Sequence, residues 1–446
     1  MNLNYVGSVA ERFMKFRSTL AVSEGVAPNL FNAISIYIPK SLAAKQFNAG
    51  AYTADSVTAE KYAVIAVTVD NYKDVLADGS NLLSQWLPVF NDGTNSAVML
   101  ICIVFDDTGF TATVSDKAVT WAPLTKAFNE LYFVSFFKTL FSEHYDGSKK
   151  DDGEENQRYN DSNYFDMALA LSYQCEVEST LSMCLLEIKV VVPAKIATDT
   201  NICKILSYDR GKETAKCTTL TGTDLATRAE YFWGYLNLIG GTHTEVHVHN
   251  GIFMIPIILG KWFEAKNTSG QFIGNKLAKI RLSKNGVKPT GLPSPLNSDV
   301  NLNLAKDIYT ILDSKNVGYF ISIANDSDSD VELVRDRSIS GMPVTAYNIS
   351  KWIDYTTAQD VAKYRDSVDT LTKPVLCNQQ TYTDIQGMLI GNIQKFSGTN
   401  RVESVTVNFP PFSEAKVGNS LQGTAVWKGK YIDDLESVDI SGSITF

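Results

Sequence analysis

Histidine and glutamate alternate in one short segment of the chain, which reads His-Thr-Glu-Val-His-Val-His. Its alternate residues are His243, Glu245, His247 and His249. On a β-strand these side chains share one face, and imidazole and carboxylate groups can bind Zn²⁺ or another divalent ion. Four alternate positions span about 20 Å of extended strand, so only two neighbours could share an ion and a second strand would have to supply the other ligands.

An ordinary strand explains the same segment without a metal. In that interpretation the strand is antiparallel to its neighbours, Val246 and Val248 are buried, and the polar residues face solvent. Both interpretations stay open on the sequence alone.

A second group of possible ligands is the acidic run Asp-Ser-Asp-Ser-Asp at 326–330. It begins like the calcium-binding loop of an EF-hand, which continues with Gly at the sixth position and Glu at the twelfth. Those positions hold Val331 and Arg337. The run therefore predicts a solvated turn.

The usual sequence motifs of catalysis are missing. The chain has no GxxxxGK[ST] or GxGxxG phosphate loop, no GxSxG, no HExxH and no CxxC pair. Its 4 histidines leave few candidates for a Ser/His/Asp triad. We therefore expect a protein that is not an enzyme and needs no cofactor, with a metal-dependent enzyme using His247 and His249 as the less favoured alternative.

The composition predicts a soluble globular protein of two or three domains, with 446 residues, 44% hydrophobic and 20% charged. The net charge of -9 and the lack of long basic runs argue against nucleic-acid binding. No secretory signal is expected. The longest apolar stretch, 251–263, is too short to span a bilayer and predicts a buried strand. The 6 cysteines, without CxxC spacing, predict reduced and mostly buried thiols.

Hydrophobic patterns along the chain predict an α/β protein with mixed α+β parts. Strands are expected at 33–37, 62–69, 97–105, 318–324, 342–354, 403–409 and 421–431, helices at 81–90, 121–141 and 381–396, and a helix passing into a strand at 165–191. The expected domains are an N-terminal arm (1–30), an α/β domain (31–145), an acidic exposed loop (146–163), a second α/β domain or outer insertion (164–287), a C-terminal core domain (288–436) and a C-terminal strand arm (437–446).

The last ten residues have the pattern of a strand with one apolar face. That face consists of Val438, Ile440, Ile444 and Phe446. Chain ends fray unless they are tied into a sheet. We therefore expect a neighbouring molecule to receive this strand.

From Ser269 onward, the succession of segments resembles the contractile tail sheath proteins of bacteriophages and related injection machines. The segments that carry the resemblance are SGQFIGNKLAKIRL, NLAKDIYTILDSKNVGYFISIAND, GMPVTAYNISKWIDYTTAQDVAKY, TDIQGMLIGNIQKFSG and SLQGTAVWKGKYIDDLESVDISGSITF. Residues 31–268 show no such match. The alternative is another arm-exchanging virion protein of a tail or capsid.

The resemblance implies a virion tail component that is assembled in the host cytoplasm. Subunits would stack in helical rings around an inner tail tube, between baseplate and tail terminator proteins, with no nucleic acid bound and no membrane insertion. The N- and C-terminal arms would add strands to sheets of neighbouring subunits, and such heterologous contacts build open helical assemblies. Contraction would rotate the subunits as rigid bodies and drive the tube, without a cofactor.

Overall fold

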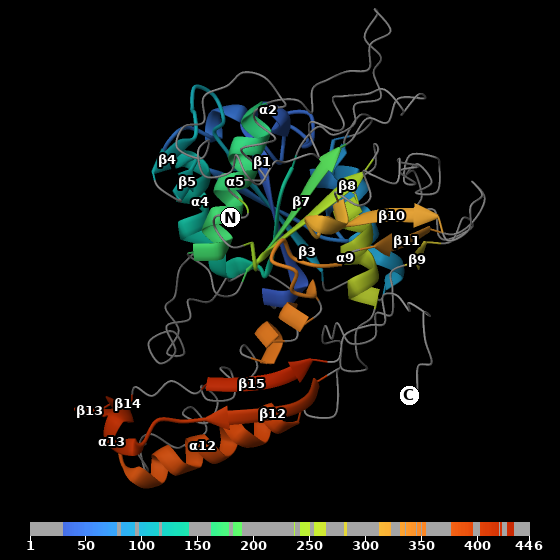
Figure 1. Cartoon of the computed structure of the whole chain (residues 1–446). Helices are drawn as coiled ribbons and strands as arrows, with labels where there is room; N and C mark the ends of the chain where they lie inside the picture. The colour runs from blue at the N-terminus through green and yellow to red at the C-terminus, as the bar shows by residue number, and fades with distance from the viewer. Residues whose placement is uncertain are drawn as a thin grey trace, which may run out of the picture. The chain divides into compact units, whose positions relative to one another are not determined.

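The computed structural model describes parts of the chain that fall into two units (Figure 1). The described residues are 30–77, 82–93, 98–115, 118–141, 162–177, 182–189, 236, 241–249, 254–264, 281–282, 312–322, 331–334, 336–344, 346–348, 350–353, 376–395, 402–418, 420–421 and 426–431. The first unit contains those up to Val344, and the second contains the rest. The expected arm at 437–446, residues 146–161 of the expected loop at 146–163, and residues 1–29 lie outside the described residues.

A six-stranded sheet with the order β2-β3-β1-β6-β7-β8 forms the centre of the first unit. Its strands are β1 (Ala33–Pro39), β2 (Ala63–Val67), β3 (Met99–Phe105), β6 (Phe137–Leu140), β7 (Met183–Lys189) and β8 (Thr244–His249). Neighbouring strands are parallel, except that β2 is antiparallel to β3. The fold class is therefore α/β with a mixed sheet, and β7 and β8 extend the same sheet as the strands before residue 145.

Helices cover both faces of this sheet. Lys138 and Phe137 are adjacent on β6 and so point to opposite faces. The Lys138 ammonium lies 5.7 Å from the ring of Phe128 on α4 (Ala122–Leu131), whereas Phe137 makes an edge contact with Phe263 on α9 (Met254–Glu264) at 5.9 Å. The helix α5 (Ser162–Val177) packs beside α4, and the 3₁₀ segment η3 (Leu82–Gly93) packs with α9. β1 and β3 are buried at every position because they are covered on both sides.

Smaller elements complete the first unit. They are η1 (Leu30–Asn32), α2 (Lys40–Ala43), η2 (Ala54–Ser56), α3 (Tyr72–Val75), β4 (Thr113–Ser115), β5 (Ala118–Thr120), η4 (Tyr132–Val134), β9 (Arg281–Leu282), β10 (Tyr319–Ser322) and β11 (Val331–Val334). The outer edge of β8 is also paired. Gly318 N donates to Val246 O at 2.8 Å, and Ile339 N donates to Thr244 O at 2.9 Å.

The second unit contains a helix and a short antiparallel sheet. Its elements are α12 (Gln379–Gln394), β12 (Val402–Asn408), α13 (Phe412–Ala415), β13 (Lys416–Val417), β14 (Ser420–Leu421) and β15 (Val426–Tyr431). β12 pairs with β15, and α12 packs against β12. The side chain of Asn378 caps α12 by accepting from Thr381 N at 2.9 Å.

The prediction of a strand at 251–263 is wrong, because the apolar run forms the helix α9. A short run that is apolar all round cannot be assigned to helix or strand by its period. Pro256 lies in the first helical turn, where its missing N–H is tolerated. The carboxylate of Glu187 accepts from Ile255 N and satisfies another N–H of that turn.

Two further predictions need correction. Residues 346–348 and 350–353 are helical, and the buried residues Val344, Tyr347, Asn348 and Trp352 have the i, i+3, i+4, i+8 spacing of a helix face, so 342–354 is not a strand. The helix predicted at 121–141 ends at Leu131, and β6 follows.

Candidate functional site: a buried Glu–His pair

The structure brings two of the predicted metal ligands together. Glu245 Oε1 lies 2.7 Å from His247 Nε2, and their side chains are 0% and 1% exposed. The Cα of His247 is in register with that of Glu187 on the parallel strand β7, and Glu187 is also buried. The interpretation of this segment as an antiparallel strand with a solvated polar face is therefore wrong. Its polar residues lie beneath α9, whose first turn is capped by Glu187.

The other two candidate ligands differ in position. His243 precedes β8, and its N–H donates to Glu176 Oε1 at 2.6 Å while its ring Nδ1 lies 3.0 Å from Cys175 O. Both partners belong to the end of α5, on the sheet face opposite to Glu245. His249 is the last residue of β8, and its side chain lies outside the described part of the structure.

Burial controls the protonation of the pair. Desolvation raises the pKa of Glu245 to about 8, and the side chain of Asp336 opposes this shift. Desolvation lowers the pKa of His247 to about 4, opposed by the negative charge of Asp336. At neutral pH the pair therefore consists of a carboxylic acid beside a neutral imidazole, a form that removes the cost of two buried charges.

The described residues do not complete a metal site. Within them, no group of three or more His, Cys, Asp or Glu side chains could hold an ion. The acidic run at 326–330 lies outside the described residues. The chemistry that the Glu245–His247 pair supports is the retention of one buried proton between two neutral groups.

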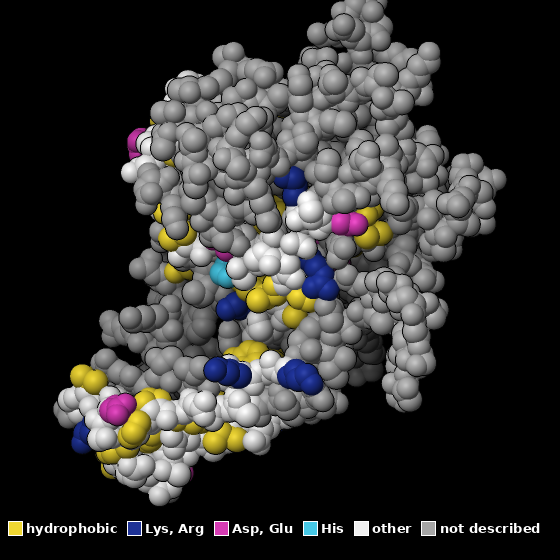
Figure 2. All heavy atoms as spheres, in the orientation of Figure 1, with side chains coloured by type: hydrophobic (Ala, Val, Ile, Leu, Met, Phe, Trp, Pro, Cys, Tyr) yellow, Lys and Arg dark blue, Asp and Glu magenta, His cyan; other side chains and the backbone are white. Residues whose placement is uncertain are grey.

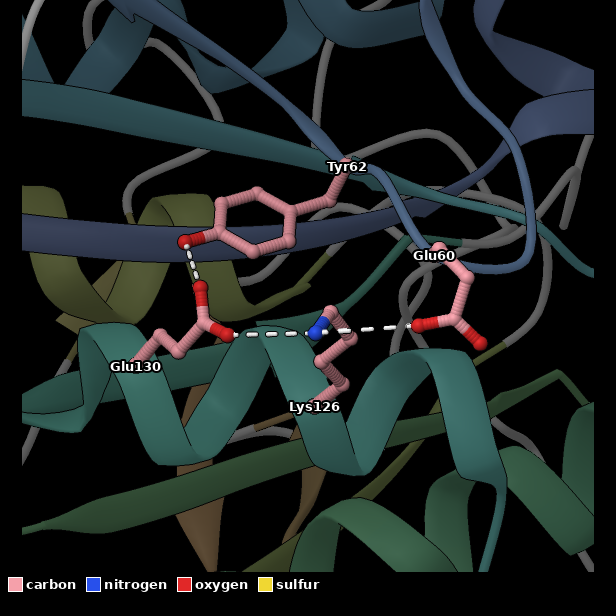
Figure 3. Close-up of polar contacts among 4 residues, drawn as sticks. All are labelled: Glu60, Tyr62, Lys126 and Glu130. Carbon is pink, nitrogen blue, oxygen red and sulfur yellow. Dashed lines mark hydrogen bonds and ion pairs between the residues drawn. The ribbon is translucent and has the colours of Figure 1, made fainter.

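A second polar group joins the segment just before β2 to α4 at the surface (Figure 3). Tyr62 OH donates to Glu130 Oε2 at 2.7 Å, and Lys126 Nζ lies 3.4 Å from Glu130 Oε1 and 3.8 Å from Glu60 Oε2. Burial and the bond to Glu130 raise the pKa of Tyr62. Exposed ion pairs of this kind contribute roughly 0–1 kcal/mol. We interpret the group as a structural contact, which the sequence indicates only through the i, i+4 spacing of Lys126 and Glu130.

Sequence reasoning missed Glu187 and Lys138, both buried in the sheet. They stand within apolar strand patterns, and only the pairing of β6, β7 and β8 places them beside other polar groups. No signal in the sequence alone could have identified them as members of polar clusters.

Comparisons with known proteins add no identification. No protein-family model matches the chain, and no curated protein matches its sequence. Among the helices that the structure describes, none combines the length and apolar character that crossing a bilayer requires.

Proposed function

We propose that the chain is a structural subunit of a contractile phage tail sheath, which polymerises around an inner tube and contracts to drive that tube through the host envelope. The basis is the order of segments after Ser269, which resembles that family. The chain is then a multidomain protein whose two terminal arms join neighbouring copies. Baseplate and terminator proteins would bound the assembly, and no cofactor takes part.

The observation that carries the proposal is the small sheet of the second unit. β12 and β15 pair along Val402–Asn408 and Val426–Tyr431 and, among the described residues, with each other only. Within the described part of the second unit, each strand therefore has an outer edge of backbone N–H and C=O groups on which another strand can add. α12 packs against β12 and would support an enlarged sheet from one side.

Charge favours an acidic strand at this sheet. Lys428 and Lys430 alternate on β15 and are exposed, and Figure 2 shows basic side chains gathered over the strands of the second unit. Residues 433–439 carry four carboxylates, namely Asp433, Asp434, Glu436 and Asp439. The apolar residues of the arm, Val438, Ile440, Ile444 and Phe446, would fill pockets of the acceptor and set its register. Opposite charges add attraction that weakens with salt.

Removal of the arm tests the proposal. A chain without residues 437–446 should stay monomeric in analytical ultracentrifugation while its circular dichroism spectrum and unfolding temperature match those of the full-length monomer. The double variant Ser441→Ala and Ser443→Ala, which changes the polar face of the same arm, is the control and should assemble normally. Normal polymerisation of the truncated chain would refute the role of this strand.

A further inference from the structure

Two thiols meet in the core of the first unit. Cys175 belongs to α5 and Cys184 to β7, and both are buried and free. α5 packs against β7, both side chains belong to the same buried core cluster, and Cys175 contributes to raising the pKa of Cys184. His243 connects their backbones, because its ring Nδ1 lies 3.0 Å from Cys175 O and its own carbonyl accepts from Cys184 N at 2.7 Å. His243, the residue before β8, thus ties the backbone of α5 at Cys175 to the backbone of β7 at Cys184.

A buried amine stands beside the thiols. Lys138 on β6 is in register with Cys184, is buried, and donates from Nζ to Ser135 O at 2.5 Å. Desolvation lowers the pKa of Lys138 to about 8, and both cysteines oppose this shift. No carboxylate among the described residues contributes to that shift. A cation beside a thiol favours the thiolate, which is the nucleophilic form.

A phenol completes the cluster. The hydroxyl of Tyr37 on β1 is buried and has no hydrogen-bond partner among the described residues. Tyr37 belongs to the same core cluster as the two cysteines; desolvation raises its pKa, and the charges of Cys175 and Cys184 raise it further. The core of this unit therefore holds an amine, a phenol and two thiols where the surrounding residues are apolar.

We propose that Cys175 and Cys184 are a redox pair, which a peroxide converts into a disulfide between α5 and β7. In the first step one thiolate attacks the O–O bond of the peroxide; its sulfur becomes a sulfenic acid, and the released hydroxide takes a proton to form water. In the second step the other thiol attacks the sulfenic sulfur, the S–S bond forms, and a second water leaves. Two thiols lose two electrons and two protons, and hydrogen peroxide is reduced to two waters.

Burial sets the rate and the product of this reaction. Desolvation and the neighbouring Cys175 raise the pKa of Cys184, and Lys138 opposes them, so thiolate is scarce and oxidation is slow. Once one sulfur is oxidised, the second thiol is a neighbour in the same core cluster and captures it. The cross-link ties the helix to the sheet and should raise the unfolding temperature of the first unit.

Peroxide treatment of the full-length folded chain tests the pair directly. After the peroxide is removed with catalase, the chain is denatured, alkylated with N-ethylmaleimide, digested and mapped by mass spectrometry. We expect a peptide pair joined through Cys175 and Cys184, restored to alkylated cysteines by dithiothreitol. Cys102, which is buried on β3, is the internal control and should stay alkylated. The joined peptide should disappear in Cys175→Ser and in Cys184→Ser.

The time course includes a second internal reference and a variant. Cys377, which is only partly buried, shows when peroxide has acted on an accessible thiol. Replacement of Lys138 by Met should slow formation of the disulfide several-fold. Full alkylation of Cys175 and Cys184 after Cys377 has been oxidised would overturn the proposal, as would a disulfide from either cysteine to another partner. None of these readouts depends on assembly, so the result leaves the proposed sheath function to its own test.

Discussion

Lys138, Glu245 and His247 are ionisable side chains buried in the core of the first unit. Desolvation shifts each pKa toward the neutral form: downward for Lys138 and His247, upward for Glu245. Because these shifts change proton binding on unfolding, each side chain makes the stability of the fold depend on pH in a defined window.

Replacement of Lys138 by Met should change the pH dependence of stability. The pKa of Lys138 is about 8 in the fold against 10.5 when unperturbed. Between these values the unfolded chain holds the proton and the fold does not, so stability rises with pH, by roughly 3 kcal/mol in total. Urea unfolding at pH 7.5 and pH 10 should therefore show a gain for the wild type that the variant lacks. Equal gains would show that Lys138 keeps its proton in the fold.

The contribution of the Glu245–His247 pair to folding stability should be constant over a middle range of pH and should fall above and below that range. From pH 4.5 to 6.5 the fold holds one proton, on Glu245, and the unfolded chain also holds one, on His247, so their contribution is constant. Above pH 6.5 the unfolded chain loses its proton while the fold keeps one up to pH 8, so stability falls as pH rises. Between pH 4.5 and pH 4 the unfolded chain holds two protons and the fold one, so stability falls as pH decreases.

Glu245→Gln isolates this effect. The amide stays neutral, so the loss of stability between pH 6.5 and 8 should disappear, while the loss on acidification should persist and extend up to pH 6.5 because of His247. Unfolding temperatures measured every half pH unit from 4 to 8.5 distinguish the two profiles. A variant with the same alkaline decline as the wild type would contradict the protonated state of Glu245.

At the scale of elements, the turn before β8 has no room for a side chain at Gly241, whereas α12 has room for one at Gly387. Gly241 has φ 56°, and a Cβ there would lie 2.6 Å from Ile339 Cβ. Gly241→Ala should therefore lower the free energy of unfolding by at least roughly 1–2 kcal/mol, because a residue with a side chain is strained in the left-handed conformation. The clash with Ile339 adds to this loss. Gly387→Ala in α12, where a Cβ meets nothing within 4 Å, is the control and should stabilise its helix by about 0.5–1 kcal/mol. Thermal unfolding of both variants checks the contrast, and equal effects would contradict it.

The elements also show how far sequence patterns reach. β1, β3, α12 and β12 were predictable, because continuous apolar runs or clear periods define them. α9 was not predictable, because its residues are apolar all round and show no helical period. Its first turn is also capped by Glu187, which belongs to β7 and is far away in sequence. The pairing of Glu245 with His247 followed from alternation, but their burial depends on α9 and on the segment around Asp336. The Lys138–Cys184 contact depends on the register of two parallel strands, which no local pattern specifies.

At the scale of the whole molecule, the sheets of the two units differ in how their faces are covered and how their edges are paired. The first has a sheet covered on both faces, with its β8 edge paired by Gly318 and Ile339. The second, in the residues that the structure describes, pairs β12 only with β15, and α12 packs against β12. Under the proposed function, a third strand from a neighbouring copy would add main-chain hydrogen bonds to this sheet and would link assembly to the stability of the second unit.

Electron microscopy of the purified full-length chain, negatively stained after concentration at low salt, tests the proposed function most directly. The proposal predicts long, hollow, striated cylinders of regular helical pitch, formed without nucleotide or metal. Closed shells, thin smooth tubes or monomers at every concentration would contradict a tail sheath subunit.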